Sequence, residues 1–139
     1  MKENSVTQKE PLGCSIACVA FIKNVSYKTA KVRYFNKLGD AKKTGYMCKD
    51  VVKALNRAGK AYDYVYIKGR QNFKEDSIVF IKRSKRYPKG HYLVKAKKGW
   101  MDPWINFNVK KPVLERARSG FRQKLPDRPI YLILPKTAS

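Results

Sequence analysis

The chain has 139 residues, of which 43% are hydrophobic, a composition that favours a folded domain over a disordered chain. Its 32 Lys and Arg against 10 Asp and Glu give a formal net charge of +22, well beyond what solubility requires. The longest uncharged apolar run, residues 13–22, has about half the length of a membrane-spanning helix, so we expect no transmembrane segment. We expect a single domain over residues 1–139 whose partners include a polyanion, either nucleic acid or an acidic assembly.

Cysteine usage and the N-terminal sequence indicate the compartment. Three cysteines, an odd number, favour a reducing compartment over a secreted, disulfide-bonded domain. Glu3 and Glu10 precede the apolar run and Lys23 follows it, which is unlike a secretory signal. We therefore expect a cytoplasmic protein, or a virion-associated one if the chain is encoded by a phage.

The first part of the chain has the apolar periodicity of helices. A first helix is predicted to begin near Gly13, where apolar residues recur three and four positions apart. A second is predicted over residues 28–38, ended by Gly39, and a third over residues 46–58, ended by Gly59. The face of the first helix consists of Cys14, Ala17, Cys18, Phe21 and Ile22.

After Gly59 the apolar period changes to two, and Val, Ile and Tyr become common, which indicates strands. The basic residues 110–128 are predicted to form a loop with a short helix over residues 113–117. Helices followed by antiparallel strands predict an α+β fold with N-terminal helices packed on an antiparallel β-sheet. The predicted strands cover residues 62–68, 77–82, 91–96, 99–102, with an extension to residue 106 left open, and 130–134.

Cys14 occupies a position suited to a nucleophile. In the first turn of a helix, the macrodipole and the unpaired N–H groups favour a thiolate over a thiol. On position alone, however, a buried structural role is the commoner one for a free cysteine, and we expect that role for Cys18 and Cys48. Position alone therefore leaves both roles open for Cys14.

His91 is the only histidine of the chain, and it opens a predicted strand. With a two-residue turn after this strand, Asn106 pairs with His91. In the same register Asp102 pairs with Lys95, so both Asp102 and Asn106 lie on the same sheet face as the imidazole. Either residue is then placed to orient the ring through a hydrogen bond to Nδ1.

Residues 8–22, QKEPLGCSIACVAFI, resemble the start of the peptidase domains that process double-glycine leader peptides for bacteriocin-exporting transporters. That family of papain-like cysteine peptidases places a glutamine six residues before its nucleophilic cysteine, as Gln8 precedes Cys14 here. It later has a histidine followed by an aromatic residue, an aliphatic residue and valine, and then an Asp-Pro pair. These are similar to His91-Tyr-Leu-Val and to Asp102-Pro in this chain.

The resemblance implies a papain-like fold and a cysteine peptidase, or a related acyl-transfer enzyme, that cleaves a peptide or isopeptide bond of a peptide or protein substrate. It implies that Cys14 is the nucleophile and His91 the general base. Asp102 would orient the imidazole, with Asn106 as the alternative. Gln8 would be the side-chain donor to the oxyanion.

The alternative function is that of a catalytically idle papain-like scaffold that acts as a basic module binding nucleic acid or a virion. Its support is the charge, which catalysis does not need. The chain has no phosphate-binding loop, dinucleotide fingerprint or metal-ligand spacing, so we expect no cofactor and no metal. Five tyrosines lie among basic residues, an arrangement compatible with base stacking, although strand packing is their commoner role. They are Tyr62, Tyr64, Tyr66, Tyr87 and Tyr92.

Overall fold

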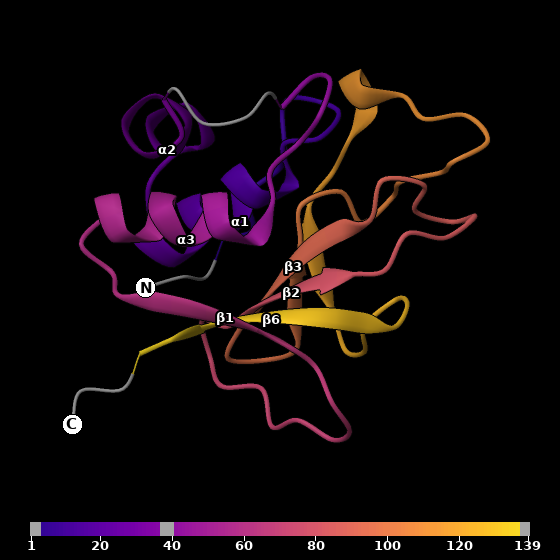
Figure 1. Cartoon of the computed structure of the whole chain (residues 1–139). Helices are drawn as coiled ribbons and strands as arrows, with labels where there is room; N and C mark the ends of the chain where they lie inside the picture. The colour runs from indigo at the N-terminus through magenta and orange to yellow at the C-terminus, as the bar shows by residue number, and fades with distance from the viewer. Residues whose placement is uncertain (1–3, 37–40, 137–139) are drawn as a thin grey trace.

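The computed structural model describes residues 4–36 and 41–136. Within them, α-helices come first and the strands of one antiparallel sheet follow, so the predicted α+β arrangement with helices packed on a sheet is confirmed (Figure 1). The helices are α1 (Cys14–Lys23), α2 (Tyr27–Tyr34) and α3 (Cys48–Arg57). The strands are β1 (Tyr62–Tyr66), β2 (Ile78–Ile81), β3 (His91–Lys95), β4 (Trp100–Asp102), β5 (Gly120–Arg122) and β6 (Pro129–Pro135).

The sheet has the order β1-β6-β2-β3-β4-β5, and each neighbouring pair is antiparallel. The last strand in the chain, β6, lies between β1 and β2. The helices cover one face of the sheet, where α1 packs on β3 and α3 packs on β1 (Figure 1). None of the helices in the described part of the chain has the length and apolar character needed to cross a lipid bilayer.

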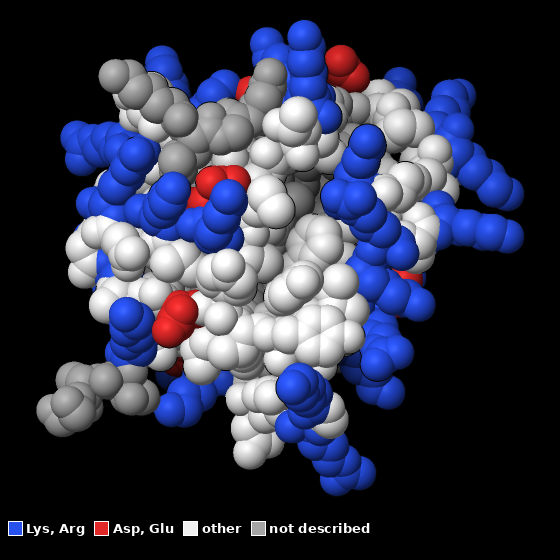
Figure 2. Space-filling view, viewed as in Figure 1, with Lys and Arg blue, Asp and Glu red and all other residues white. Residues whose placement is uncertain are grey.

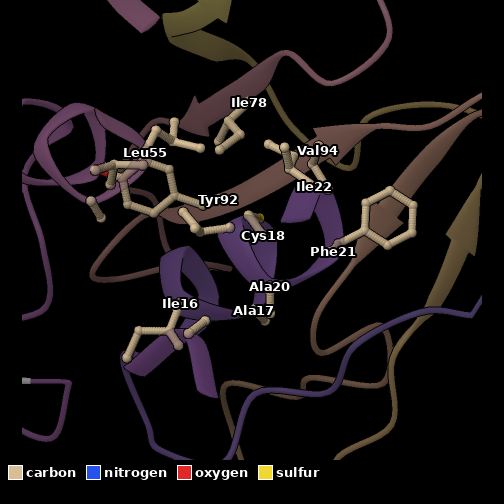
Figure 3. Packing of buried hydrophobic residues seen from close by; sticks show 14 of the residues in the cluster. Ile16, Ala17, Cys18, Ala20, Phe21, Ile22, Leu55, Ile78, Tyr92 and Val94 are labelled. Atoms are coloured by element: carbon tan, nitrogen blue, oxygen red, sulfur yellow. The ribbon is translucent and has the colours of Figure 1, made fainter. Parts of the chain in front are cut away.

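Helix α1 is the centre of the main core. Its residues from Cys14 to Ile22 are all buried, because α2, α3 and β3 surround the helix. The helix is therefore buried on every side, and its residues are apolar beyond the predicted stripe, with Ser15 as the buried polar exception. Figure 3 shows Cys18 beside Tyr92 of β3, and Ile22 beside Val94 of the same strand.

The opposite face of the sheet carries a second apolar cluster. Along β2 and β3 successive side chains alternate between the two clusters, since neighbouring residues of a strand point to opposite faces. Both faces are covered, which explains why these strands are apolar nearly throughout. The buried members of the second cluster are Val79, Ile81, Tyr87, Leu93, Trp100 and Leu132.

The predicted helices occur, but α2 ends earlier than predicted. It ends at Tyr34 and not at residue 38, because Phe35 leaves the helix and packs edge-on against Tyr46 at 4.8 Å. At this end of α2, Arg57 of α3 donates hydrogen bonds to the backbone carbonyl oxygens of Tyr34 and Asn36. The predicted end of the helix, Leu38 and Gly39, lies outside the described residues.

Strand β5 falls in the segment 110–128 that was predicted to be a loop. It has only three residues, too few to show a period of two, and it forms because its backbone pairs with β4. The short helix predicted over residues 113–117 is a 3-10 helix over Leu114–Arg116.

Leu55 of α3 is fully buried in the main core, so Leu55→Ala removes apolar contacts and leaves a cavity. We expect it to lower the free energy of unfolding by about 2–5 kcal/mol. Val32 of α2 is 60% exposed and provides the control, since Val32→Ala should change the same quantity by less than about 0.5 kcal/mol. Urea denaturation measures both, and equal effects would contradict this placement of Leu55.

Candidate active site

Three of the four predicted site residues meet where the start of α1 packs against the sheet. Cys14 is the first residue of α1, His91 the first residue of β3 and Asp102 the last residue of β4. Cys14 lies close enough to His91 for the two side chains to interact electrostatically. The packing of α1 on β3 thus joins the predicted nucleophile to the predicted base.

His91 and Asp102 form a buried ion pair. The distance from His91 Nε2 to Asp102 Oδ1 is 2.7 Å, and the two residues are 5% and 0% exposed. The sequence predicted that Nδ1 would make this bond, and that prediction is wrong. Because Asp102 engages Nε2, Nδ1 is the ring nitrogen left for Cys14.

Two further groups hold the Asp102 carboxylate. The Trp104 backbone N–H donates to Oδ1 at 2.9 Å, and Arg122 Nε donates to Oδ2 at 2.7 Å. Arg122 also donates from Nη2 to the carbonyl oxygen of Ile105 at 3.1 Å. The carboxylate therefore has charged or N–H partners at both oxygens, as a buried charge requires.

The turn between β3 and β4 differs from the predicted one. Lys95 pairs with Trp100, so residues 96–99 form the turn, and the predicted pairing of Lys95 with Asp102 is wrong. The observed register between β3 and β4 thus differs from the predicted one by two residues. A shift of two keeps every side chain on its original face, which is why Asp102 still reaches His91.

Asn106 is not part of the site. Its side chain is exposed, donates from Nδ2 to the Arg116 carbonyl oxygen at 3.0 Å, and accepts from the Arg118 N–H at 2.9 Å. Asn106 was predicted to pair with His91, but β4 ends at Asp102 and the chain turns away before reaching it. Asp102 is the residue bonded to the imidazole.

Aromatic rings cover the imidazole. Tyr87 stacks parallel to His91 with the ring centroids 5.0 Å apart, and Phe107 stacks on Tyr87 at 5.7 Å. Trp104 contacts Phe107 edge-on at 4.9 Å. These rings hold the imidazole plane and exclude water from its bond with Asp102.

The buried pair shifts the pKa values of both partners. Burial alone would lower the pKa of His91, but the charge and hydrogen bond of Asp102, with the interaction with Cys14, raise it from 6.5 to about 10. Burial alone would raise the pKa of Asp102, but His91, Arg122 and the Trp104 N–H lower it from 3.8 to about 2. The imidazole is therefore positively charged at neutral pH.

Gln8, the fourth predicted residue, lies in the loop that leads to Cys14. It is 2% exposed, and its backbone N–H donates to the carbonyl oxygen of Pro103, next to Asp102. Its Nε2 donates to the carbonyl oxygens of Glu10 at 3.0 Å and Pro11 at 3.1 Å. Its Oε1 is buried without a hydrogen-bond partner among the described residues. Gln8 thus ties the start of α1 to the end of β4.

Glu10 fixes the same loop to α2. Its Oε1 accepts from the Tyr27 hydroxyl at 2.9 Å, and its Oε2 pairs with Lys31 Nζ at 2.7 Å. A Cβ on Gly13 would collide with the Tyr27 hydroxyl, so only glycine allows this close approach before Cys14. The start of α1 is therefore held from both the helical and the sheet side.

The other two cysteines differ from each other. Cys18 is fully buried, as predicted, and burial raises the pKa of its thiol well above the ordinary value. Cys48 is only half-buried, so the prediction of a buried core cysteine is wrong for it, although burial still raises its pKa. Cys48 is the first residue of α3, and its Sγ lies 3.8 Å from the Tyr92 hydroxyl oxygen.

Sequence reasoning missed Arg122 and Tyr87 as parts of the site. Arg122 pairs with Trp100 across β4 and β5, which places it on the face of Asp102, but β5 has no sequence signal of its own. Tyr87 lies in a basic, proline-containing loop, where only its position four residues before His91 marked it.

Within residues 4–36 and 41–136, no group of three or more His, Cys, Asp or Glu side chains is placed to hold a metal ion. The sequence matches no model in a scan of protein families and no protein in a search of curated proteins. The chemistry of the site therefore has to be argued from its own residues.

The buried pair makes stability depend on pH. Folded His91 keeps its proton up to about pH 10, whereas a histidine of the unfolded chain loses it near pH 6.5. Between these values the folded state binds one more proton, so the free energy of unfolding falls as pH rises, by up to about 1.4 kcal/mol per pH unit. We expect urea denaturation to show this slope from pH 6.5 to 9, and His91→Gln to abolish it.

Lys97→Gln, in the exposed turn after β3, serves as the control and should keep the slope. An unchanged slope in His91→Gln would show that His91 is not protonated in the folded state at neutral pH.

Proposed function

We propose that the protein is a papain-like cysteine peptidase, or a related acyl-transfer enzyme, that acts on a peptide or isopeptide bond. The observation that supports this is the chain of contacts from Cys14 through His91 to Asp102, with the cysteine at the start of a helix. A nucleophile, a base beside it and a group that orients the base are what acyl transfer needs. We place this enzyme in the cytoplasm, or in a virion if the chain comes from a phage.

In the first step the Cys14 thiolate attacks the carbonyl carbon of the substrate. A C–S bond forms, and the carbonyl π electrons move to the oxygen. The His91 imidazolium then gives its Nδ1 proton to the leaving amine as the C–N bond breaks, which yields an acyl-enzyme and a free amine. Asp102 keeps the imidazole in the orientation that this transfer requires.

The oxyanion needs donors beside Cys14. The backbone N–H of Cys14 lies in the first turn of α1, where N–H groups have no partner within the helix. Gln8 is the second donor in this proposal. Both hydrogens of its Nε2 are engaged by backbone carbonyls, so one must leave Glu10 or Pro11 when the oxyanion forms.

Water completes the reaction. The neutral imidazole that remains after the first step takes a proton from a water molecule, and the oxygen attacks the acyl-enzyme carbon. The C–S bond breaks, the carboxylic acid leaves, and the Cys14 thiolate and His91 imidazolium return. If an amine replaces water, the same steps form a new amide bond.

A cysteine in the first turn of a helix and beside a histidine should react with iodoacetamide faster than a buried cysteine without such partners. We therefore expect rapid alkylation of Cys14 at neutral pH, measured by mass spectrometry, with Cys18 unmodified. His91→Ala and Asp102→Asn should slow this reaction. Asn106→Ala, outside the site, is the control and should not.

The variant Gln8→Ala distinguishes stabilisation of the oxyanion from activation of the Cys14 thiol. Alkylation develops no oxyanion, so its rate should stay nearly unchanged, whereas peptide hydrolysis should fall by about 100-fold or more. Alkylation of Cys14 at the same rate in the unmodified protein and in His91→Ala would refute the proposed pair.

A second function, binding of a polyanion, is favoured by the surface. Lys and Arg side chains surround the face of the molecule seen in Figure 2. Tyr62, Tyr87 and Tyr92 are buried and act in packing, but Tyr64 and Tyr66 are 41% and 57% exposed on β1. Exposed aromatic rings among basic side chains suit single-stranded nucleic acid, in which the bases stack and the phosphates pair with cations.

We expect the affinity for duplex DNA to fall by about 0.9 logarithmic units per phosphate contact for each tenfold rise in salt concentration, since each contact releases counterions. Filter binding over a series of salt concentrations measures this, and Cys14→Ala should bind equally well. The double variant Tyr64→Ala/Tyr66→Ala should weaken single-stranded but not duplex binding. Affinity that hardly changes between low and moderate salt would argue against this function.

A further inference from the structure

A pocket of about 700 Å³ opens beside Cys14. This volume lies within the range of about 300–1,000 Å³ that is typical of ligand sites. Cys14 lines it together with Gly90 and Tyr92, the residues on either side of His91. The centre of the face in Figure 2 is hollowed and free of charged side chains. A ligand in this pocket therefore lies against the thiol.

Aromatic rings form one wall of the pocket. Phe80 of β2 pairs with Tyr92 of β3 on one side and with Tyr131 of β6 on the other, so the three rings lie on one sheet face in adjacent strands. The Phe80 and Tyr92 centroids are 4.9 Å apart. Tyr64 of β1 extends the wall and is 41% exposed. The wall belongs to the helix-facing side of the sheet, where Tyr92 is also part of the main core.

The loop before α3 forms the facing wall. Met47, at the N-cap of α3, lines the pocket and is 65% exposed. The Tyr92 hydroxyl donates to the Tyr46 carbonyl oxygen at 2.8 Å, which holds this loop against β3. An exposed methionine opposite a row of aromatic rings suits a large apolar side chain, because its flexible thioether adapts to varied shapes.

Four cations line the same pocket. Lys43 and Lys49 come from the continuous stretch 43–49, and Arg83 and Lys89 from the connection between β2 and β3. None of the four is in an ion pair with a carboxylate of the described residues. No acidic residue is among those that line the pocket in the described part of the chain. Charges of one sign around a cleft with apolar walls concentrate their potential inside it. The pocket thus attracts negative charge and disfavours positive charge.

We propose that this pocket is a substrate subsite that binds an acidic peptide segment carrying a large apolar side chain. The role of Cys14 in it rests on the peptidase function proposed above. The aromatic wall and Met47 bury the apolar side chain, and the four cations pair with carboxylates beside it. Binding in this way holds the peptide backbone next to Cys14. A peptide fits better than a nucleic acid, because the thiol needs an acyl carbonyl and a nucleic acid backbone has none.

The test compares blocked hexapeptides with the Cys14→Ala protein, which cannot form an acyl-enzyme, so calorimetry reports binding alone. One peptide contains two glutamates and a phenylalanine. The second has glutamines for the glutamates, and the third has alanine for the phenylalanine. In the same background, Arg83→Gln/Lys89→Gln removes two pocket charges. Lys110→Gln/Lys111→Gln removes two exposed charges elsewhere and is the matched control.

We expect the glutamate peptide to bind about tenfold more tightly than the glutamine peptide, since two partly exposed ion pairs supply about 1.4 kcal/mol. The pocket variant should abolish this difference, whereas the control should keep it. Replacing the phenylalanine should weaken binding by about tenfold or more. Urea denaturation midpoints equal to that of Cys14→Ala would show that the variants are folded.

Equal binding of the glutamate and glutamine peptides would overturn the proposal, and so would equal losses in the pocket and control variants. An oligonucleotide that displaces the peptide and depends on Arg83 and Lys89, but not on Lys110 and Lys111, would assign the pocket to nucleic acid and overturn it as well. Peptide binding with the expected preferences, but without cleavage by the unmodified protein, would refute the peptidase and leave the subsite standing. Cleavage of the peptides without a preference for glutamate would support the peptidase and overturn the subsite.

Discussion

A carboxylate without solvent exposure, that of Asp102, must be neutralised by the protein itself, because an unpaired charge is very costly to remove from water. The protein meets this requirement from three elements: His91 at the start of β3, the Trp104 N–H after β4, and Arg122 at the end of β5. The ion pair between Asp102 of β4 and Arg122 of β5 therefore stabilises the pairing of these three-residue strands beyond their few backbone hydrogen bonds. The same carboxylate keeps the imidazole charged and directs its other nitrogen to Cys14.

The packing of α1 on β3 is shared by the site and the main core. Helix α1 is buried on all sides, so its axis cannot move without disturbing α2, α3 and the sheet together. The loop before it is fixed on one side by Glu10 with Tyr27 and Lys31, and on the other by Gln8 with Pro103. Cys14 and His91 thus hold their positions through interactions that also stabilise the fold.

Charge has two separate roles in this molecule. Inside, one carboxylate is balanced by one imidazolium and one guanidinium, which hold a proton at neutral pH and are shielded from salt by burial. Outside, most of the +22 charge lies on exposed side chains that salt screens. At the pocket beside Cys14, the surface charge lies next to the buried site, because surface cations surround an apolar cleft that leads to the thiol. The proposed binding of a polyanion and the proposed preference for an acidic substrate would both weaken with salt, while the buried pair would not.

The sequence by itself determined the α+β class, the start of α1 at Cys14 and the placement of Asp102 on the face of His91, because apolar periods of 3.6 and two residues are local signals. The face was correct despite a wrong turn, since an error of two residues does not change it. Only the tertiary structure showed that Asp102, and not Asn106, bonds to His91, and that Nε2 makes this bond. It also ended α2 at Tyr34 and placed Arg122 and Tyr87 in the site. Each of these depends on side-chain contacts formed in the folded chain, and β5 is a strand only because β4 lies beside it. Local patterns cannot carry such information, because the free energy that selects these contacts arises only when the segments meet.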